Sequence, residues 1–110
     1  MDKKPNFLKR EYKQIINAYL KKLAEQKIPV ESAYFFGSRA AGHEHRWSDL
    51  DLCIISRIFG FDRQAERVRL MNLSDGVSDL IEPHPYSPAD FENRFDPLAQ
   101  QIKLTGIRVA

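Results

Sequence analysis

The chain has 110 residues, enough for one domain whose core buries about 65% of the surface that the unfolded chain would expose. Its formal net charge of +2, from 17 Lys and Arg against 15 Asp and Glu, gives no argument for binding nucleic acid through many phosphate contacts. A single cysteine, Cys53, excludes an intramolecular disulfide and a multi-cysteine metal site. No stretch approaches the roughly 20 apolar residues of a membrane span, so we expect a cytoplasmic protein.

The first half of the chain predicts one helix and two strands. Apolar residues recur at three- and four-residue steps over residues 7–26, which predicts an amphipathic helix that ends before Pro29. Residues 33–36 form a short aromatic run that predicts a buried strand. A loop over residues 37–48 leads to a second strand over residues 50–55, which is apolar on both faces except at its acidic start.

The second half begins with a further helix and a third strand. Asp62 can cap a helix over residues 64–73, and a turn then leads to a strand over residues 77–81. Pro83 and Pro85 are expected to stop regular structure, because proline lacks the N–H that a strand or helix uses.

Two capping residues followed by proline, Ser87-Pro88 and Asp96-Pro97, predict the starts of C-terminal helices, and Gly106 fits their end. This order of elements predicts a single small α/β domain with a short mixed sheet flanked by helices. Its parts are an N-terminal amphipathic helix, a sheet that would carry the site, and the C-terminal helices, at residues 1–29, 30–82 and 83–110.

Two acids stand at the start of the second predicted strand. Asp49 and Asp51 alternate along it, so they project from the same face with Cα atoms about 6.5 Å apart. Carboxylate oxygens are the ligands that Mg²⁺ prefers, and two such ions roughly 4 Å apart can support an in-line displacement at phosphorus. A solvated strand end could also hold both acids without metal, so Asp-x-Asp alone is weak evidence for a metal site.

A glycine and a serine follow the first predicted strand. Gly37 allows the backbone to approach a ligand closely, and Ser38 adds a hydroxyl where unpaired N–H groups could meet a phosphate. A plain turn after a strand is the alternative. A strand that ends in Gly-Ser, with Asp-x-Asp opening a second strand ten residues later, is far more specific than either motif alone.

This combination closely resembles the Gly-Ser-x10-Asp-x-Asp signature of the DNA polymerase beta-like nucleotidyltransferase superfamily. The loop Gly-Ser-Arg-Ala-x-Gly and the strand Ser-Asp-Leu-Asp-Leu are similar to those of its minimal nucleotidyltransferases. The resemblance runs from the strand at Phe35 to the predicted strand with Asp79, and it implies the polymerase beta-like fold. Ala41 departs from it, because many relatives carry a second arginine there.

The resemblance also implies a third carboxylate on a neighbouring strand, for which Asp79 and Glu82 are the candidates. We predict Asp79, because it would lie inside a strand over residues 77–81 with apolar neighbours on its own face. Glu82 would then fall on the opposite face. The alternative for Asp79 is a structural ion pair with a nearby arginine.

The resemblance further implies a Mg²⁺-dependent transfer of a nucleoside monophosphate from an NTP, with ATP as the expected donor and AMP as the transferred group, to an acceptor hydroxyl with release of pyrophosphate. It implies that three acids act in catalysis and bind two Mg²⁺ ions, namely Asp49, Asp51 and Asp79. It implies that the loop binds the nucleotide, through Gly37, Ser38 and Arg39. Arg39 could instead form a bridge to an acid of the sheet.

The chain has no evident acceptor pocket of its own, so we expect a homo-oligomer or a heteromeric complex. Minimal members of the superfamily resemble the antitoxin of toxin–antitoxin pairs, with a helical HEPN-domain protein as partner. That likeness implies transfer of AMP to a tyrosine of the partner. A non-catalytic antitoxin that acts by contact, or a catalytic subunit that modifies a small molecule or RNA, are the alternatives.

Other conspicuous side chains favour structural explanations. His43 and His45 lack a third clear ligand for a transition metal, and His84 lies between two prolines, so all three are expected at the surface. Trp47 is expected to anchor the loop rather than to stack on a base. Cys53, in an apolar run, is expected to be a buried thiol.

Overall fold

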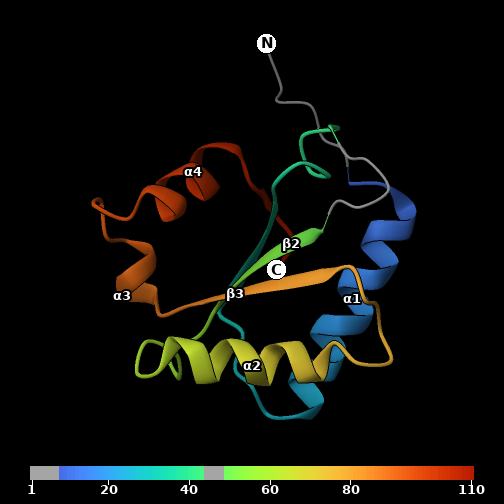
Figure 1. The fold of residues 1–110 in the computed structure, drawn as a ribbon, viewed down its shortest axis with the longest axis horizontal. Helices are drawn as coiled ribbons and strands as arrows, with labels where there is room; N and C mark the ends of the chain where they lie inside the picture. The colour runs from blue at the N-terminus through green and yellow to red at the C-terminus, as the bar shows by residue number, and fades with distance from the viewer. Residues whose placement is uncertain (1–7, 44–48) are drawn as a thin grey trace.

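The computed structural model describes residues 8–43 and 49–110. They form an α/β domain of four helices and four strands over this part of the chain (Figure 1). In chain order the elements are α1 Arg10–Glu25, β1 Ser32–Phe36, β2 Leu50–Ile55, α2 Arg63–Leu73, β3 Ile81–Tyr86, α3 Pro88–Phe91, α4 Pro97–Thr105 and β4 Ile107–Arg108. No helix among them is both long and apolar enough to span a membrane.

The strands form one mixed sheet in the order β3-β2-β1-β4. β1 pairs antiparallel with both β2 and β4, and β2 pairs parallel with β3. The α/β fold with a short mixed sheet and flanking helices is therefore confirmed. The capping predictions are also confirmed, because the side chains of Asp62, Ser87 and Asp96 each accept a hydrogen bond from the backbone N–H three residues later.

The position predicted for the third strand is wrong. Residues 77–80 continue the turn after α2, where the N–H groups of Val77 and Ser78 donate to the carbonyl of Ser74. The strand begins at Ile81 and includes Pro83 and Pro85. Both prolines are tolerated because β3 is the edge strand of the sheet, where the side away from its neighbour requires no N–H donor.

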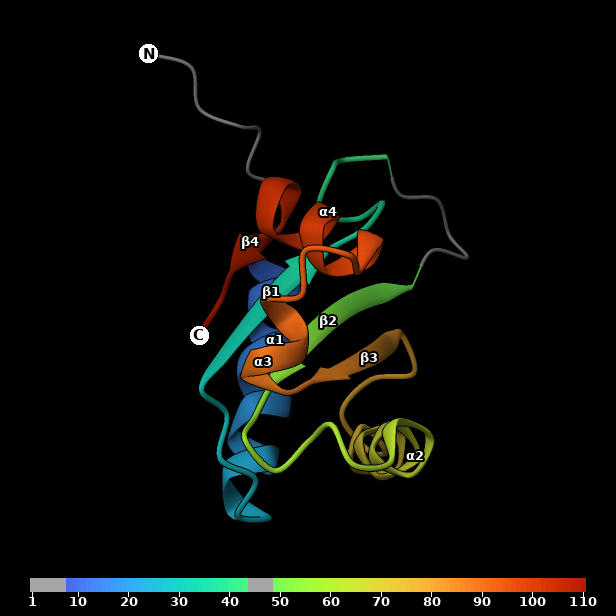
Figure 2. The same ribbon diagram turned by 90° about the vertical axis from the view of Figure 1, so that its left-hand side faces the viewer.

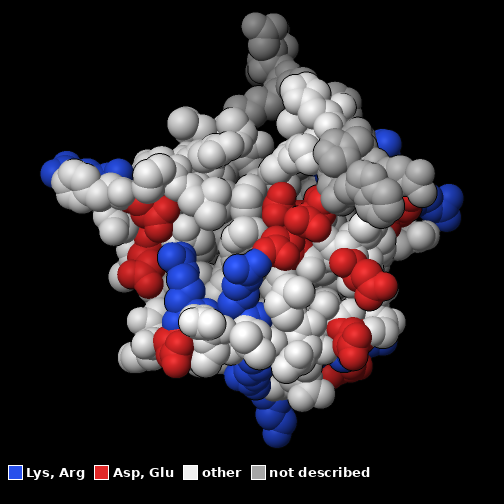
Figure 3. Space-filling view, viewed as in Figure 1, with Lys and Arg blue, Asp and Glu red and all other residues white. Residues whose placement is uncertain are grey.

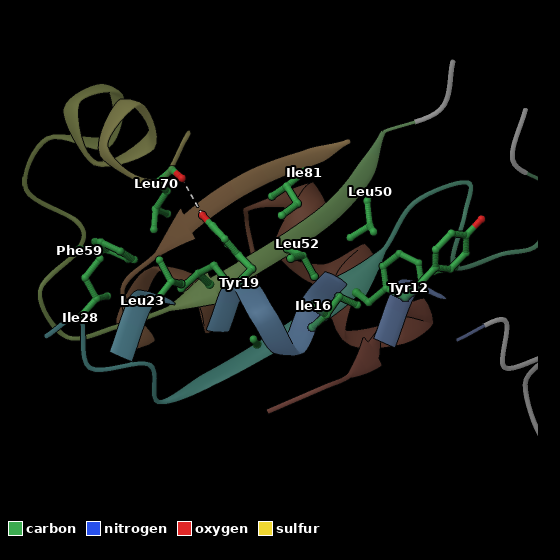
Figure 4. Close-up of a cluster of buried hydrophobic side chains, with 14 residues drawn as sticks. Tyr12, Ile16, Tyr19, Leu23, Ile28, Leu50, Leu52, Phe59, Leu70 and Ile81 are labelled. Atoms are coloured by element: carbon green, nitrogen blue, oxygen red, sulfur yellow. Dashed lines mark hydrogen bonds between the residues drawn. The ribbon is translucent and has the colours of Figure 1, made fainter. Parts of the chain in front are cut away.

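The two faces of the sheet have separate cores. On one face, Leu50 and Leu52 pack against α1 and against Leu70 of α2 (Figure 4), and Ile54 belongs to the same cluster. On the other face, the intervening residues Cys53 and Ile55 pack with α3 and α4. Figure 2 shows α3 and α4 in front of the strands and α1 behind them, and Figure 1 shows the same helices to the left and the right of the strands. Alternation along β2 thus assigns Asp51, like Cys53, to the face that α3 and α4 cover in part.

A buried hydrogen bond joins α1 to α2 beneath the sheet. The hydroxyl of Tyr19, which is fully buried, donates to the carbonyl oxygen of Leu70 at 2.8 Å (Figure 4). Burial raises the pKa of this phenol well above its ordinary value. The same carbonyl also accepts from the N–H of Ser74 at 3.2 Å, so it would keep one partner without Tyr19.

Tyr19→Phe is expected to lower the free energy of unfolding by about 1 kcal/mol, because it removes one buried hydrogen bond and no packing volume. That loss corresponds to a fall in Tm of about 4 °C for a domain of this size. Thermal denaturation followed by circular dichroism would measure it. Tyr34→Phe is the matched control, since the Tyr34 hydroxyl has no hydrogen-bond partner among the described residues. Equal Tm values for the two variants would contradict the prediction.

Candidate active site

The Gly-Ser loop lies directly against the second acid of the Asp-x-Asp motif. The last residue of β1, Phe36, is the Cα partner of Asp51 in β2. Gly37 follows with φ +85°, and a Cβ atom built on it would lie 2.2 Å from Oδ2 of Asp51. Only glycine fits this position, because both its backbone conformation and the neighbouring carboxylate exclude a side chain.

Gly37→Ala is expected to destabilise the fold and to displace the carboxylate of Asp51. The left-handed backbone alone costs about 1–2 kcal/mol for a non-glycine residue. Gly76→Ala is a matched control, because Gly76 has φ +78° but nothing within 4 Å of an added Cβ. We expect Gly37→Ala to have the lower Tm of the two in thermal denaturation; the same Tm would mean that Asp51 accommodates the methyl group without cost.

Arg39 anchors the loop to α1. Its side chain is 8% exposed, and its Nη1 donates to the hydroxyl of Tyr12 at 2.9 Å while the guanidinium lies over the Tyr12 ring. The N–H of His43 donates to the carbonyl of Ser38, which closes the turn beyond Gly37. These contacts hold the start of the loop against α1, and the role of Arg39 in nucleotide binding stays a prediction.

The two acids of the motif differ in their surroundings. Asp49 is exposed and immediately precedes β2. Asp51 lies inside β2 with 23% of its side chain exposed, and its Oδ1 is 3.2 Å from Nε2 of His84. Asp51 is therefore fixed by its neighbours on both sides, Gly37 on the β1 side and His84 on the β3 side.

Glu82, rather than Asp79, lies beside this pair. Glu82 is the Cα partner of Asp51 in the parallel pairing of β2 with β3, so the two side chains project from the same face. Asp79 is exposed in the turn before β3. The prediction that Asp79 lies inside a strand is wrong, because β3 starts two residues after that acid.

His84 belongs to the same face, which the sequence analysis missed. It stands two residues after Glu82 in β3, and its ring packs edge-on against Phe36 with centroids 5.0 Å apart. With 25% of its side chain exposed, it is partly buried beside Asp51 rather than a surface residue. His84 could have been predicted from the sequence, because residues two apart in a strand share a face and His84 follows Glu82 by two. That inference requires the correct bounds of β3.

Asp51 and Glu82, which are neighbours across β2 and β3, together with Asp49 just before β2 form what we call the acidic patch. Figure 3 shows one group of acidic side chains near the centre of this view, with basic side chains next to it on the side of α2. Glu82 pairs with Arg67 of α2, and its side chain is 22% exposed. This pairing offsets part of the repulsion that adjacent carboxylates would otherwise produce.

The donors of this patch suit a hard divalent cation, although the side chains are not arranged as a preformed metal site. Over residues 8–43 and 49–110, no three or more His, Cys, Asp or Glu side chains are grouped to hold a metal ion. Asp51 contacts His84, and Glu82 pairs with Arg67. Asp49 just before β2, Asp51 in β2 and Glu82 in β3 nonetheless offer carboxylate oxygens, the donor type that Mg²⁺ prefers.

The other residues singled out from the sequence are Cys53, the two loop histidines and Trp47. Cys53 is fully buried, and burial raises the pKa of its thiol to about 12, so the prediction of an inert core thiol is confirmed. His43 lies at the end of the described loop segment. His45 and Trp47 fall outside the described residues.

Comparison with known proteins gives a consistent result. A crystal structure described as a putative nucleotidyltransferase from Sulfolobus solfataricus is similar with a TM-score of 0.62 and 15% identity, over 87% of this chain and 77% of that one. A mutant of the toxin–antitoxin complex MntA-HpeT is similar with a TM-score of 0.55 and 20% identity, over 86% of this chain and 71% of that one. At these identities the likeness shows the fold alone, and no curated protein matches the chain.

The family model described as polymerase beta, nucleotidyltransferase matches residues 14–110. That range includes the Gly-Ser loop, the Asp-x-Asp strand and the neighbouring β3 with Glu82. Because the match covers nearly the whole chain, the protein belongs to the polymerase beta nucleotidyltransferase family.

Proposed function

We propose that the protein transfers a nucleoside monophosphate, AMP from ATP, to an acceptor hydroxyl in a Mg²⁺-dependent reaction. The observation that carries the proposal is the contact between the two motifs. The backbone of Gly37 lies against the carboxylate of Asp51, and Glu82 is paired with Asp51 in the adjacent strand. A phosphate held by the loop would therefore lie beside the acids.

In this proposal the loop and the acids have separate roles. Gly37 and Ser38 hold the terminal phosphates of the nucleotide through backbone N–H groups and the serine hydroxyl. Asp49, Asp51 and Glu82 hold the cations, and Glu82 takes the role that the sequence analysis gave to Asp79. When bound, Mg²⁺ supplies positive charge that neutralises the phosphates.

The chemical step is a displacement at the α-phosphorus. A bond forms between the acceptor oxygen and this phosphorus, the bond to pyrophosphate breaks, and the hydroxyl proton passes to a carboxylate of the site. Glu82 is the proposed acceptor of that proton, because it lies beside Asp51 at the side of the sheet away from the loop. Positioning and electrostatic stabilisation supply most of the catalysis in phosphoryl transfer.

The acceptor in this proposal is a tyrosine of a HEPN-type helical partner, for which the chain acts as antitoxin. The shared fold with the toxin–antitoxin complex MntA-HpeT supports this choice over a small-molecule acceptor. Such a partner would also cover the open acidic face. The second candidate is an antitoxin that neutralises its partner by contact alone, which the contacts of Asp51 with His84 and of Glu82 with Arg67 favour, because they engage the acids within the protein.

Co-expression of the chain with its helical partner, followed by incubation with α-labelled ATP and Mg²⁺, tests the proposal. We expect labelled partner and released pyrophosphate, and no label with Asp51→Asn. Mass spectrometry of the partner would locate AMP on a tyrosine. An unlabelled partner that is still inhibited by the chain, equally by wild type and by Asp51→Asn, would establish the contact antitoxin instead.

A further inference from the structure

A pocket of about 160 Å³ lies at the outer edge of β3, beside the acidic patch. We call it the β3-edge pocket. Its lining comes from α2, β3 and α4, namely Arg63, Arg67, His84, Pro85, Tyr86 and Leu98. Two of these residues contact the acids directly: His84 is 3.2 Å from Asp51, and Arg67 pairs with Glu82. The pocket therefore opens onto the site described above.

The sheet order separates this pocket from the loop. β2 lies between β1, which ends at Gly37, and β3, which lines the pocket. If the terminal phosphates rest on Gly37 and Ser38, pyrophosphate leaves on the β1 side. The attacking oxygen in an in-line displacement comes from the opposite side, which here is the β3 side. The β3-edge pocket is thus placed to receive the acceptor.

The charge of the pocket indicates which acceptor it suits. Among the described residues no carboxylate forms an ion pair with Arg63, whose Nε and Nη2 donate to the carbonyl of Pro85 at 3.4 Å and whose side chain also hydrogen-bonds to that of Tyr86. Its guanidinium lies over the Tyr86 ring, 4.3 Å from the centroid. Arg67 is neutralised by Glu82, and a divalent cation bound to Glu82 would release it. Two planar guanidinium groups at one pocket can each donate two hydrogen bonds to an anionic oxygen group such as a carboxylate.

We propose that the β3-edge pocket is an acceptor subsite that binds an acidic side chain next to the reacting hydroxyl of a polypeptide. This inference rests on the proposed transferase function. A volume of about 160 Å³ equals that of about five water molecules, which is room for one side chain. Pro85 and Leu98 provide apolar walls that shield an ion pair from water.

A polypeptide fits this pocket better than a nucleic acid does. Nucleic-acid affinity draws on many phosphate contacts along a strand, whereas the pocket offers two arginines and the chain has a net charge of only +2. A single acidic side chain needs one bidentate pairing, which Arg63 or Arg67 can supply.

The test uses two short probes, N-acetyl-Glu-Tyr-amide and N-acetyl-Gln-Tyr-amide, titrated into the ¹⁵N-labelled chain with Mg²⁺. We expect the glutamate probe to shift the backbone amides of His84, Tyr86 and Leu98 and to bind about tenfold tighter than the glutamine probe, because a charge-assisted hydrogen bond exceeds a neutral one. Arg63→Gln and Arg67→Gln should each remove about this factor. Arg69→Gln, the same change at an exposed position of α2, is the matched control.

Two further measurements keep the test decisive. Arg63→Lys keeps the charge while removing the planar fork, so it should restore part of the affinity even if Arg63→Gln is less stable. Equal affinities for the two probes, or no effect of either glutamine variant, would overturn the proposal. Tighter binding of a thymidine tetranucleotide than of the glutamate probe would overturn it in favour of a nucleic-acid acceptor.

The same titration separates this inference from the proposed function. Mg·ATP is expected to shift the amides of Gly37 and Ser38 and to leave that of Leu98 in place. If ATP instead shifts Leu98 and not Gly37, the pocket belongs to the nucleotide and the subsite is wrong. If ATP shifts neither while the glutamate probe binds as described, the transferase function fails and the anionic pocket stands.

Discussion

Replacing Asp49 and Asp51 together by asparagine is expected to abolish Mg²⁺-dependent ATP binding. The wild-type chain should bind Mg·ATP and lose most of that affinity when EDTA removes the cation. The double variant should show no such difference, because asparagine oxygens carry no charge and hold Mg²⁺ poorly. Isothermal titration calorimetry with and without EDTA measures both expectations.

The fold should survive this double substitution. Two carboxylates that project from one face repel each other, so their removal is expected to leave Tm unchanged or slightly higher. Asp79→Asn is the matched control, since it removes an exposed carboxylate from the turn before β3. Equal Mg·ATP affinity in the double variant and the control would refute the assignment of Asp49 and Asp51 as cation ligands.

Glu82→Gln is expected to reduce transfer steeply, whereas Asp79→Asn should leave it nearly unchanged. Glu82 is paired with Asp51 across the parallel strands, but Asp79 is exposed outside β3. If Glu82 takes the proton of the acceptor hydroxyl, the loss should be about 10²–10⁴-fold, as for general bases elsewhere. Initial rates of AMP transfer at saturating Mg·ATP would measure the ranking.

Two readouts separate catalysis from structure in this comparison. Glu82→Gln also removes the ion pair with Arg67, which is partly exposed and contributes about 0–1 kcal/mol, so Tm should change little. Mg·ATP affinity should fall less than in the double variant of Asp49 and Asp51. The reverse ranking, with Asp79→Asn inactive and Glu82→Gln active, would mean that the turn before β3 rearranges on binding.

The sequence by itself determined the first half of the fold and the two motifs. The apolar period over α1, the aromatic run of β1 and the apolar run of β2 are strong local signals, and each element was found close to its observed bounds. Capping by Asp62, Ser87 and Asp96 was readable because it depends on contacts only three residues apart. The family resemblance likewise depends on a fixed spacing along the chain, that of Gly37, Asp49 and Asp51.

Only the tertiary structure decided which residues complete the site. Pro83 and Pro85 are strong local signals against a strand, and they are overridden because β3 pairs with β2 through one side alone. The resulting register, and not the local pattern, brings Glu82 and His84 to Asp51 and leaves Asp79 in a turn. Strand pairing joins residues some thirty positions apart, as His84 and Asp51 are, and no periodicity within one segment encodes that register.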